Sequence, residues 1–178
     1  MDKFKLLKEE LDYKGRILNL YTHYIQVPNG NIAQWDCIHH MGASAILAVN
    51  EEGKILLVRQ YRCGVNDLLL EIPAGCRDSD HEDYKVCAGR ELEEETGFAT
   101  NELHHLIDYH SAPAYTSELV SIFYTEKLIP SKQNLDENEV VEIEKYSLGE
   151  LVSMIEKGEI TDGKTIAAIF AYKNIKEK

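Results

Sequence analysis

The sequence lacks several features that would point to particular classes of protein. No stretch of its 178 residues approaches the roughly 18 consecutive apolar residues that a membrane-spanning helix needs. Its four cysteines form no C-x-x-C pair and have no metal-finger spacing. The first residues, MDKFKLLKEELDYKGR, are charged throughout and lack the apolar stretch of a signal peptide. We therefore expect a cytoplasmic protein with reduced thiols and no membrane partner.

Positive charge is also scarce. Lys and Arg number 19 against 31 Asp and Glu, which gives a formal net charge of −12. Because such a chain repels the phosphate backbone of nucleic acids, we expect no nucleic-acid partner. An acidic protein can still bind a small phosphorylated ligand through divalent cations, since Mg²⁺ commonly bridges carboxylates and substrate phosphates.

Strand-like and helix-like segments alternate along the chain. Residues 16–27 are rich in β-branched and aromatic types, and PNGN at 28–31 is a turn signal, so a β-hairpin with residues 32–38 is expected. Further strands are expected at 43–49, 54–61, 68–72, 103–110, 119–127 and 139–146, and helices at 79–96, 147–158 and 162–174.

This order predicts an α/β fold, with a mixed β-sheet and helices packed against it. We expect two parts: a small N-terminal β-rich segment at residues 1–40 and a larger domain at residues 41–178. The helix at 79–96 has signals at both ends. Ser79 and Glu82 have the S-x-x-E spacing of a capping box, and Gly97 is a typical helix end.

Three carboxylates share the last turn of that helix. At about 100° per residue, Glu91, Glu94 and Glu95 fall near 0°, 300° and 40° on one face. They repel one another, and the helix dipole is negative at this end, each effect amounting to about several tenths of a kcal/mol. Bound Mg²⁺ or Mn²⁺ would reverse both penalties, because oxygen ligands suit these ions. The alternative is a solvated acidic surface.

The stretch from Gly75 to Phe98 resembles the Nudix box. Glu82, seven further residues and then R-E-U-x-E-E-x-G-U from Arg90 to Phe98 all match, where U is apolar. One departure is that six residues, not five, separate Gly75 from Glu82. The resemblance implies a Nudix-type α/β/α sandwich and a magnesium-dependent hydrolase of a diphosphate. Arg90 is expected to orient neighbouring carboxylates, and Glu82 to cap the helix or to support the metal.

Three further segments resemble the ADP-ribose and ADP-sugar pyrophosphatase branch of this family. They are Gln60-Tyr61-Arg62, the run from Glu71 to Gly75, and Pro113, which lies sixteen residues beyond Gly97. This resemblance implies hydrolysis of ADP-ribose to AMP and ribose 5-phosphate by a homodimer that pairs through its N-terminal segment. The alternatives are another substrate, such as GDP-mannose or a dinucleotide, and a non-catalytic ligand sensor. The intact box glutamates favour turnover over sensing.

The resemblance also implies roles for individual residues. Glu94 and Glu95 would be catalytic. The metal ion, Mg²⁺ or alternatively Mn²⁺, would be held by the carbonyl of Ala74 and by Glu91, Glu94 and Glu95. Arg62 and Glu71 would bind substrate, because the planar fork of arginine suits phosphate oxygens. An ordinary surface position on a strand is an equal alternative for Arg62.

Two other groups of polar residues are candidate sites. Glu118, at the end of the segment from Ser111, is the expected general base, and a structural glutamate at a loop edge is its alternative. Adjacent histidines at 39–40 and 104–105 point to opposite sides of a strand, so each pair makes a poor metal site. No function is assigned to them from the sequence.

Overall fold

The computed structural model describes residues 3–16, 18–135 and 137–178, so the expected strand at 16–27 is tested without residue 17. The helices are Tyr84–Thr96 (α1), Leu148–Glu156 (α2) and Gly163–Lys176 (α3). The strands are Lys5–Lys14 (β1), Asn19–Gln26 (β2), Ile32–His39 (β3), Ala43–Val49 (β4), Ile55–Arg62 (β5), Asp67–Glu71 (β6), Ala74–Cys76 (β7), Phe98–Ala99 (β8), His104–His110 (β9), Leu119–Thr125 (β10), Ile129–Pro130 (β11) and Glu142–Tyr146 (β12).

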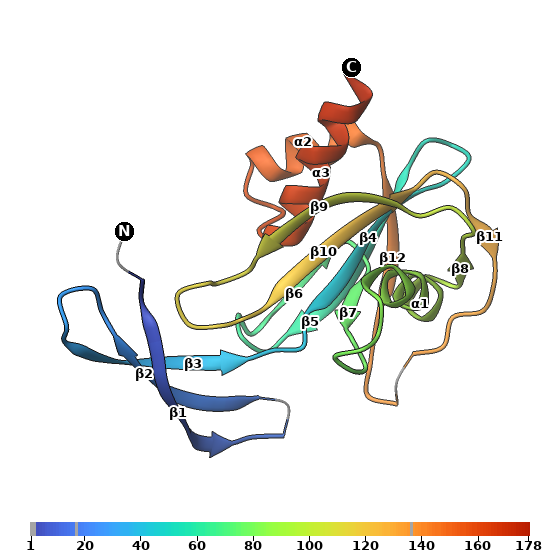
Figure 1. The fold of residues 1–178 in the computed structure, drawn as a ribbon. Helices are drawn as coiled ribbons and strands as arrows, with labels where there is room; N and C mark the ends of the chain where they lie inside the picture. The colour runs from blue at the N-terminus through green and yellow to red at the C-terminus, as the bar shows by residue number, and fades with distance from the viewer. Residues whose placement is uncertain (1–2, 17, 136) are drawn as a thin grey trace. The chain divides into compact units, whose positions relative to one another are not determined.

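The chain divides into two compact units. The first contains residues 1–42 and 110–119, and the second contains residues 43–109 and 120–178. The first unit is built on an antiparallel sheet of three strands in the order β1-β2-β3 (Figure 1). The expected β2–β3 hairpin is confirmed, and its turn is closed by a 2.9 Å hydrogen bond from Val27 N to Asn31 O.

The first unit has little core of its own. Of the described residues from 3 to 41, none is buried, and large apolar side chains remain exposed, among them Phe4, Tyr13 and Ile32. Strand β1 was not expected as a separate element, because its sequence is charged and its pairing with β2 is irregular at two places. Pairing along the backbone therefore defines this sheet more than burial does.

The segment from His110 to Leu119 is tied to the end of β3. Ile38 N donates to Tyr115 O at 2.7 Å, and Ser117 N donates to Ile38 O at 3.0 Å. A tight turn precedes these bonds, because the N–H groups of Tyr115 and Thr116 both donate to Ala112 O at 3.1 Å. The loop is thus held by backbone hydrogen bonds within the first unit.

The second unit contains a mixed sheet of seven strands. Five follow the order β12-β5-β4-β10-β9, while β6 pairs with β5 and β7 pairs with β4. Strand β10 runs parallel to β4, and β12, β6 and β7 are antiparallel to their neighbours. The predicted α/β class with a mixed sheet is confirmed. Strand β7 was missed, because a three-residue strand containing Gly75 leaves no periodic pattern to detect.

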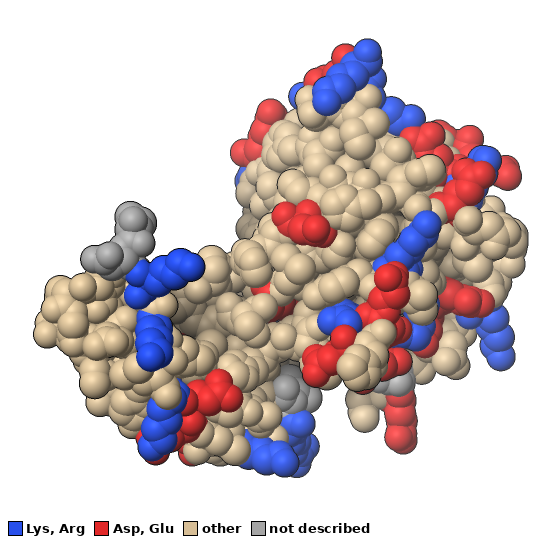
Figure 2. All heavy atoms as spheres, viewed as in Figure 1, with Lys and Arg blue, Asp and Glu red and all other residues tan. Residues whose placement is uncertain are grey.

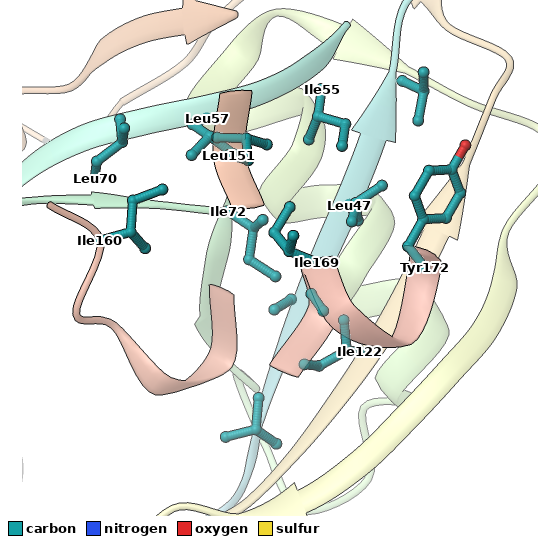
Figure 3. Close-up of a cluster of buried hydrophobic side chains, with 14 of the residues drawn as sticks. Leu47, Ile55, Leu57, Leu70, Ile72, Ile122, Leu151, Ile160, Ile169 and Tyr172 are labelled. Atoms are coloured by element: carbon teal, nitrogen blue, oxygen red, sulfur yellow. The ribbon is translucent and has the colours of Figure 1, made fainter. Parts of the chain in front are cut away.

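Strand β4 is buried on both faces, which explains its continuous apolar sequence. Leu47 and its neighbours on one face pack with α2 and α3, through side chains such as Leu151 and Ile169 (Figure 3). Ile46 on the other face packs with Leu92 of α1. The sheet therefore lies between α1 on one side and α2 with α3 on the other (Figure 1).

The ends of α2 and α3 follow local sequence signals. Ser147 and Glu150 form a capping box at the start of α2, in which the hydroxyl of Ser147 accepts from Glu150 N and the carboxylate accepts from Ser147 N. Asp162 caps α3 by accepting from Thr165 N at 2.9 Å. Among the described residues, no helix combines the length and apolarity required to traverse a bilayer.

The net charge of −12 does not produce a uniformly acidic surface on the face shown in Figure 2. There Lys and Arg side chains lie next to Asp and Glu side chains over much of the visible charged surface. The buried charged side chains among the described residues are Glu71, Glu91, Glu95 and Lys164, and two of them lie in the last turns of α1.

Candidate active site

Helix α1 begins later than the sequence suggested. Its N-cap is Asp83, whose carboxylate accepts from Lys85 N at 2.8 Å, so the expected capping box of Ser79 and Glu82 is wrong. The carboxylate of Glu82 has other partners, because it accepts from Asp78 N at 2.7 Å and from Arg90 Nε at 3.2 Å. Glu82 thus supports an arginine at the site instead of the helix entry.

The loop before α1 absorbs the additional residue found there. Arg77 folds the loop around its guanidinium, donating to the carbonyl oxygens of Glu82 and Asp80, each at 2.6 Å. The same group lies over the ring of Tyr84, 4.4 Å from its centroid. The extra length is therefore taken up ahead of the helix, and the turn that carries the three glutamates is unaffected by it.

Arg90 holds the carboxylates of the last helical turns in place, as expected. Its Nη1 donates to Glu91 Oε1 at 2.7 Å and to Glu94 Oε2 at 3.0 Å, while Nη2 donates to Cys76 O at 3.0 Å. Together with the bond to Glu82, one guanidinium joins three carboxylates and the end of β7. These charge-assisted bonds offset the repulsion that the sequence predicts among the carboxylates.

Glu91 lies against Gly75 and is almost fully buried. A Cβ atom on residue 75 would overlap the carboxylate of Glu91 and displace it, so glycine here leaves that carboxylate in its observed place. Burial raises the pKa of the Glu91 carboxyl to about 7, even though Arg90 opposes the rise. The glycine that opens the Nudix-like stretch therefore makes room for one of its glutamates.

Glu95 is the most deeply buried of the three glutamates, with 2% of its surface exposed. Its Oε1 accepts from the amide of Gln60 at 3.2 Å, and its Oε2 accepts from Ala74 N at 3.0 Å. Burial raises the pKa of the Glu95 carboxyl to about 8; the Ala74 N–H opposes this rise and the Glu91 charge adds to it. The fold thus places a carboxylate where water solvates it poorly and its hydrogen-bond donors are neutral.

Helix α1, strand β7 and the segment after β11 border one polar pocket of about 380 Å³. Its lining residues are Gln60, Arg62, Ala74, Gly75, Cys76, Asp78, Arg90, Glu91, Glu94, Asn134 and Glu139. Among the expected site residues, Ala74, Glu91, Glu94 and Arg62 are thus brought together, and Glu95 lies beneath them, bonded to Ala74.

Glu139 is a pocket residue that the sequence did not reveal. It lines the pocket, and its charge raises the pKa values of Glu91 and Glu95. In the sequence it stands in an acidic run, D-E-N-E, which has no feature that separates a pocket carboxylate from a solvated one. Two carboxylates from outside the helix, those of Asp78 and Glu139, therefore line the pocket together with Glu91 and Glu94.

Arg62 and Glu71 form a bidentate ion pair. Arg62 Nε donates to Glu71 Oε1 at 2.8 Å and Nη2 donates to Oε2 at 2.7 Å, while Lys164 Nζ also donates to Oε2. Burial of Glu71 opposes ionisation, but Arg62 and Lys164 hold its pKa below the ordinary value. Lys164 is bound in turn to Asp162, the cap of α3. Arg62 is thus held by Glu71, which Lys164 holds in turn.

Glu118, the expected general base, belongs to the first unit. The hydroxyl of Ser111 donates to its carboxylate, and His40 Nε2 lies 3.5 Å from its Oε1. Its backbone N–H donates to Thr116 Oγ1 at 3.2 Å. These contacts fix the carboxylate within its own loop, and its role as a base stays a prediction.

Comparisons with known proteins assign this arrangement to a family. The NUDIX domain family matches residues 38–169. The chain is 35% identical to an ADP-ribose pyrophosphatase of Bacillus subtilis (strain 168) over 175 residues, covering 97% of this chain and 94% of the relative. It is also 35% identical to the methanol dehydrogenase activator of Bacillus methanolicus over 168 residues, covering 93% and 90%.

A solved structure shares the fold. It is described as a crystal structure of an ADP compounds hydrolase and superposes with a TM-score of 0.85, at 23% identity, covering 98% of this chain and 94% of that one. This likeness confirms the Nudix-type architecture expected from the sequence. The family match, which spans the glutamate helix and the pocket, shows that the chain belongs to the Nudix family and is a Nudix hydrolase.

Proposed function

We propose that the protein is a Mg²⁺-dependent pyrophosphatase that adds water across the diphosphate of ADP-ribose, giving AMP and ribose 5-phosphate. The observation that carries this proposal is the polar pocket in which Glu91 and Glu94 lie together with Arg62 and Ala74. Similarity to an ADP-ribose pyrophosphatase over nearly the whole chain supports the choice of substrate. The second relative, with its different name, makes a direct test of the substrate necessary.

The residues of the pocket fit a divalent cation. Glu95 is buried, and its described hydrogen-bond donors, the Gln60 amide and Ala74 N, are neutral. The raised pKa of its carboxyl shows that a positive charge placed nearby would stabilise the carboxylate. The ligands would be the carbonyl of Ala74 and the carboxylates of Glu91, Glu94 and Glu95, all hard oxygen donors that suit Mg²⁺ or Mn²⁺. When bound, the ion would neutralise phosphate oxygens and acidify the attacking water.

Arg62 and Glu71 are proposed to act together on the substrate. Glu71 holds two of the guanidinium nitrogens of Arg62, which fixes the plane of the group at the pocket wall. A cation held in this way contacts a diphosphate without losing side-chain freedom on binding, which lowers the entropic cost of that contact. Lys164 keeps Glu71 ionised, so the pair persists at neutral pH.

The proton of the attacking water needs an acceptor, and two carboxylates are candidates. Glu118 is the candidate from the sequence, and Ser111 and His40 hold it in the first unit. Glu139 is the candidate from the pocket, because it lines the same space as Glu91 and Glu94. A general base must lie within reach of the attacking water, and Glu139 already lies in the pocket where that water would be bound.

Space for a nucleoside adjoins the pocket. A second pocket of about 400 Å³ shares Gln60 and Glu139 with the first and is bordered by Tyr61 and Val140. The ring of Tyr61 is 56% exposed, and its hydroxyl donates to Asn66 at 2.8 Å, which holds the ring in place. An exposed, oriented ring is suited to stacking with a base. This supports a substrate in which a diphosphate carries a nucleoside.

We also propose a cytoplasmic homodimer paired through the first unit. Its support is the exposed apolar side chains on a sheet that has no buried residue among those described from 3 to 41. Light scattering coupled to size exclusion would give twice the monomer mass for a dimer. A monomer at working concentration would overturn the pairing and leave the chemistry untouched.

The test of function is incubation of the protein with ADP-ribose and Mg²⁺, followed by identification of the products. AMP and ribose 5-phosphate in equal amounts, formed only with the metal, are the expected result. ADP-glucose, GDP-mannose and a dinucleotide serve as parallel substrates, and faster turnover of one of these would replace ADP-ribose. Binding of ADP-ribose without turnover of any substrate would identify a sensor and overturn the proposal.

A further inference from the structure

The face of the first unit's sheet carries a cluster of nitrogen and sulfur ligands. Nε2 of His23 and Nε2 of His39 are 3.1 Å apart, and the ligand atoms of His23, Cys37 and His39 all lie within 4.8 Å of one another. Oε2 of Glu9 lies 3.6 Å from His23 Nε2 and 3.7 Å from His39 Nε2. Three potential ligands therefore gather at one point, and the carboxylate of Glu9 lies beside the two imidazoles.

The register of the sheet explains why residues far apart in the sequence meet here. Glu9 on β1 lies directly opposite His23 on β2, and His23 lies opposite Trp35 on β3. Cys37 and His39 follow Trp35 at intervals of two, so their side chains share its face. Each of the three strands thus contributes to the cluster. His40, just after β3, has other contacts: its Nδ1 accepts from Gly42 N, and its Nε2 lies 3.5 Å from Glu118 Oε1.

From this cluster we propose that the first unit binds one Zn²⁺ ion through His23, Cys37, His39 and Glu9. Zn²⁺ is commonly held by imidazole, thiolate and carboxylate in a tetrahedral arrangement. With bond lengths of about 2.0 to 2.3 Å, neighbouring ligands of such a site lie roughly 3.3 to 3.6 Å apart. The separations among the ligand atoms of Glu9, His23 and His39 are 3.1, 3.6 and 3.7 Å, close to this range.

The donor set separates this site from the glutamates of α1. Mg²⁺ takes oxygen ligands and dehydrates reluctantly, whereas two imidazoles and a thiolate favour zinc and its neighbours. Burial, with help from the nearby Glu9 carboxylate, raises the pKa of the Cys37 thiol. Binding of the ion would displace that thiol proton to solvent, leaving the zinc–thiolate bond in its place.

The surroundings of the cluster suit a structural ion. The ring of Tyr21 stacks on that of His39, with centroids 4.2 Å apart, and this contact restricts the orientation of the imidazole. No residue described from 3 to 41 is buried, so this sheet has little apolar core to hold it together. Small folds of this kind commonly gain stability from a metal or from association. A zinc ion would cross-link β1, β2 and β3.

Cobalt substitution of the whole protein tests the site, because thiolate bound to Co²⁺ gives a charge-transfer band that oxygen ligands cannot give. The metal-free protein is titrated with Co²⁺ and then with Zn²⁺, and one equivalent of Zn²⁺ should abolish the band. Cys37→Ser should remove it, while Cys63→Ser, at an exposed cysteine, should retain it. His39→Gln should weaken Zn²⁺ binding at least about tenfold, and His40→Gln should not.

Two further measurements keep the result clear. Glu94→Gln in the box should leave the band unchanged, which separates this site from the catalytic metal. The fluorescence of Trp35, the single tryptophan and a neighbour of His23 in the sheet, reports the unfolding of the first unit. Zn²⁺ should raise the denaturant concentration at the midpoint of this unfolding in the wild type but not in Cys37→Ser. A band that is absent, or equally weak in Cys37→Ser and Cys63→Ser, would overturn the proposal.

Discussion

The two units of this protein organise their polar groups in opposite ways. In the second unit, α1 packs through Leu92 into a buried core, and the acidic groups lie at the edge of that core. In the first unit, His23, Cys37 and His39 gather on one face of a thin sheet. Burial can place a charge where it is unfavourable until a cation arrives, whereas strand register alone can assemble ligands at a surface.

The largest effect is expected from Glu95→Gln, which removes the buried charge but keeps the shape of the side chain. The new amide can still accept from Ala74 N, so the fold should persist. Loss of a direct metal ligand should reduce Mg²⁺-dependent hydrolysis by more than the roughly 10- to 100-fold typical of residues that only support a ligand. Steady-state kinetics with ADP-ribose measures this, and ordinary activity in the variant would remove Glu95 from the metal site.

The two candidate bases come from different units, so replacing each tests how the units share the chemistry. We expect Glu139→Gln to lower kcat by about 10² or more with little change in KM, because Glu139 lines the pocket. Glu118→Gln is the matched variant in the first unit. A loss confined to Glu118→Gln would assign the base to the loop from Ser111 to Glu118, as the sequence suggested.

The difference in packing predicts different sensitivities to truncation. Leu92→Ala should lower the free energy of unfolding by about 2–5 kcal/mol, since Leu92 is completely buried beside Ile46 and Phe123. Ile32→Ala, at a side chain that is 61% exposed within one protomer, should change it by less than about 0.5 kcal/mol at protein concentrations below those at which protomers pair. Denaturation followed by helical circular dichroism, which reports the second unit, and by Trp35 fluorescence tests this contrast. Similar losses in both variants would contradict it.

The raised pKa values predict how pH affects the protein in the presence of a chelator. The folded state binds the Glu95 proton more tightly than the unfolded chain, with a pKa of about 8 against 4.5. Stability from this group is therefore full below pH 4.5 and is lost as the pH rises to about 8, by on the order of a few kcal/mol. Glu95→Gln should be more stable than the wild type at pH 8 and equal to it near pH 4.5. Equal stability at both values would contradict the burial of a charge.

The sequence predicted the parts of the site that follow from local geometry. Glu91, Glu94 and Glu95 share a helical face because of the helical period, and Gly97 ends α1 with a φ of 70°, which glycine adopts readily. The predicted start of α1 was wrong because several polar residues near it could cap a helix. Asp83 is the N-cap in the structure, while the carboxylate of Glu82 accepts from Arg90. The local sequence indicates which residues can cap a helix, but it does not indicate which tertiary contacts those residues make.

Contacts between distant parts of the chain could not be predicted from the sequence. Glu71 and Lys164 meet although 93 positions separate them, and nothing local indicates that Arg62 would be held by this pair. The same holds for Glu139 at the pocket. Adjacent histidines were not expected to act as joint ligands, and the cluster instead joins His39 to His23 and Cys37 once the register of β2 and β3 is fixed.

The proposed hydrolysis requires the carboxylates of α1 to bind divalent cations. The most direct test is Mn²⁺ binding, followed by electron paramagnetic resonance, with AMP present and Cys37→Ser as the background so that the first unit cannot contribute. We predict binding that is lost when Glu91, Glu94 and Glu95 are all changed to Gln. No affinity for Mn²⁺ in the background protein, or affinity that survives the triple change, would contradict the account.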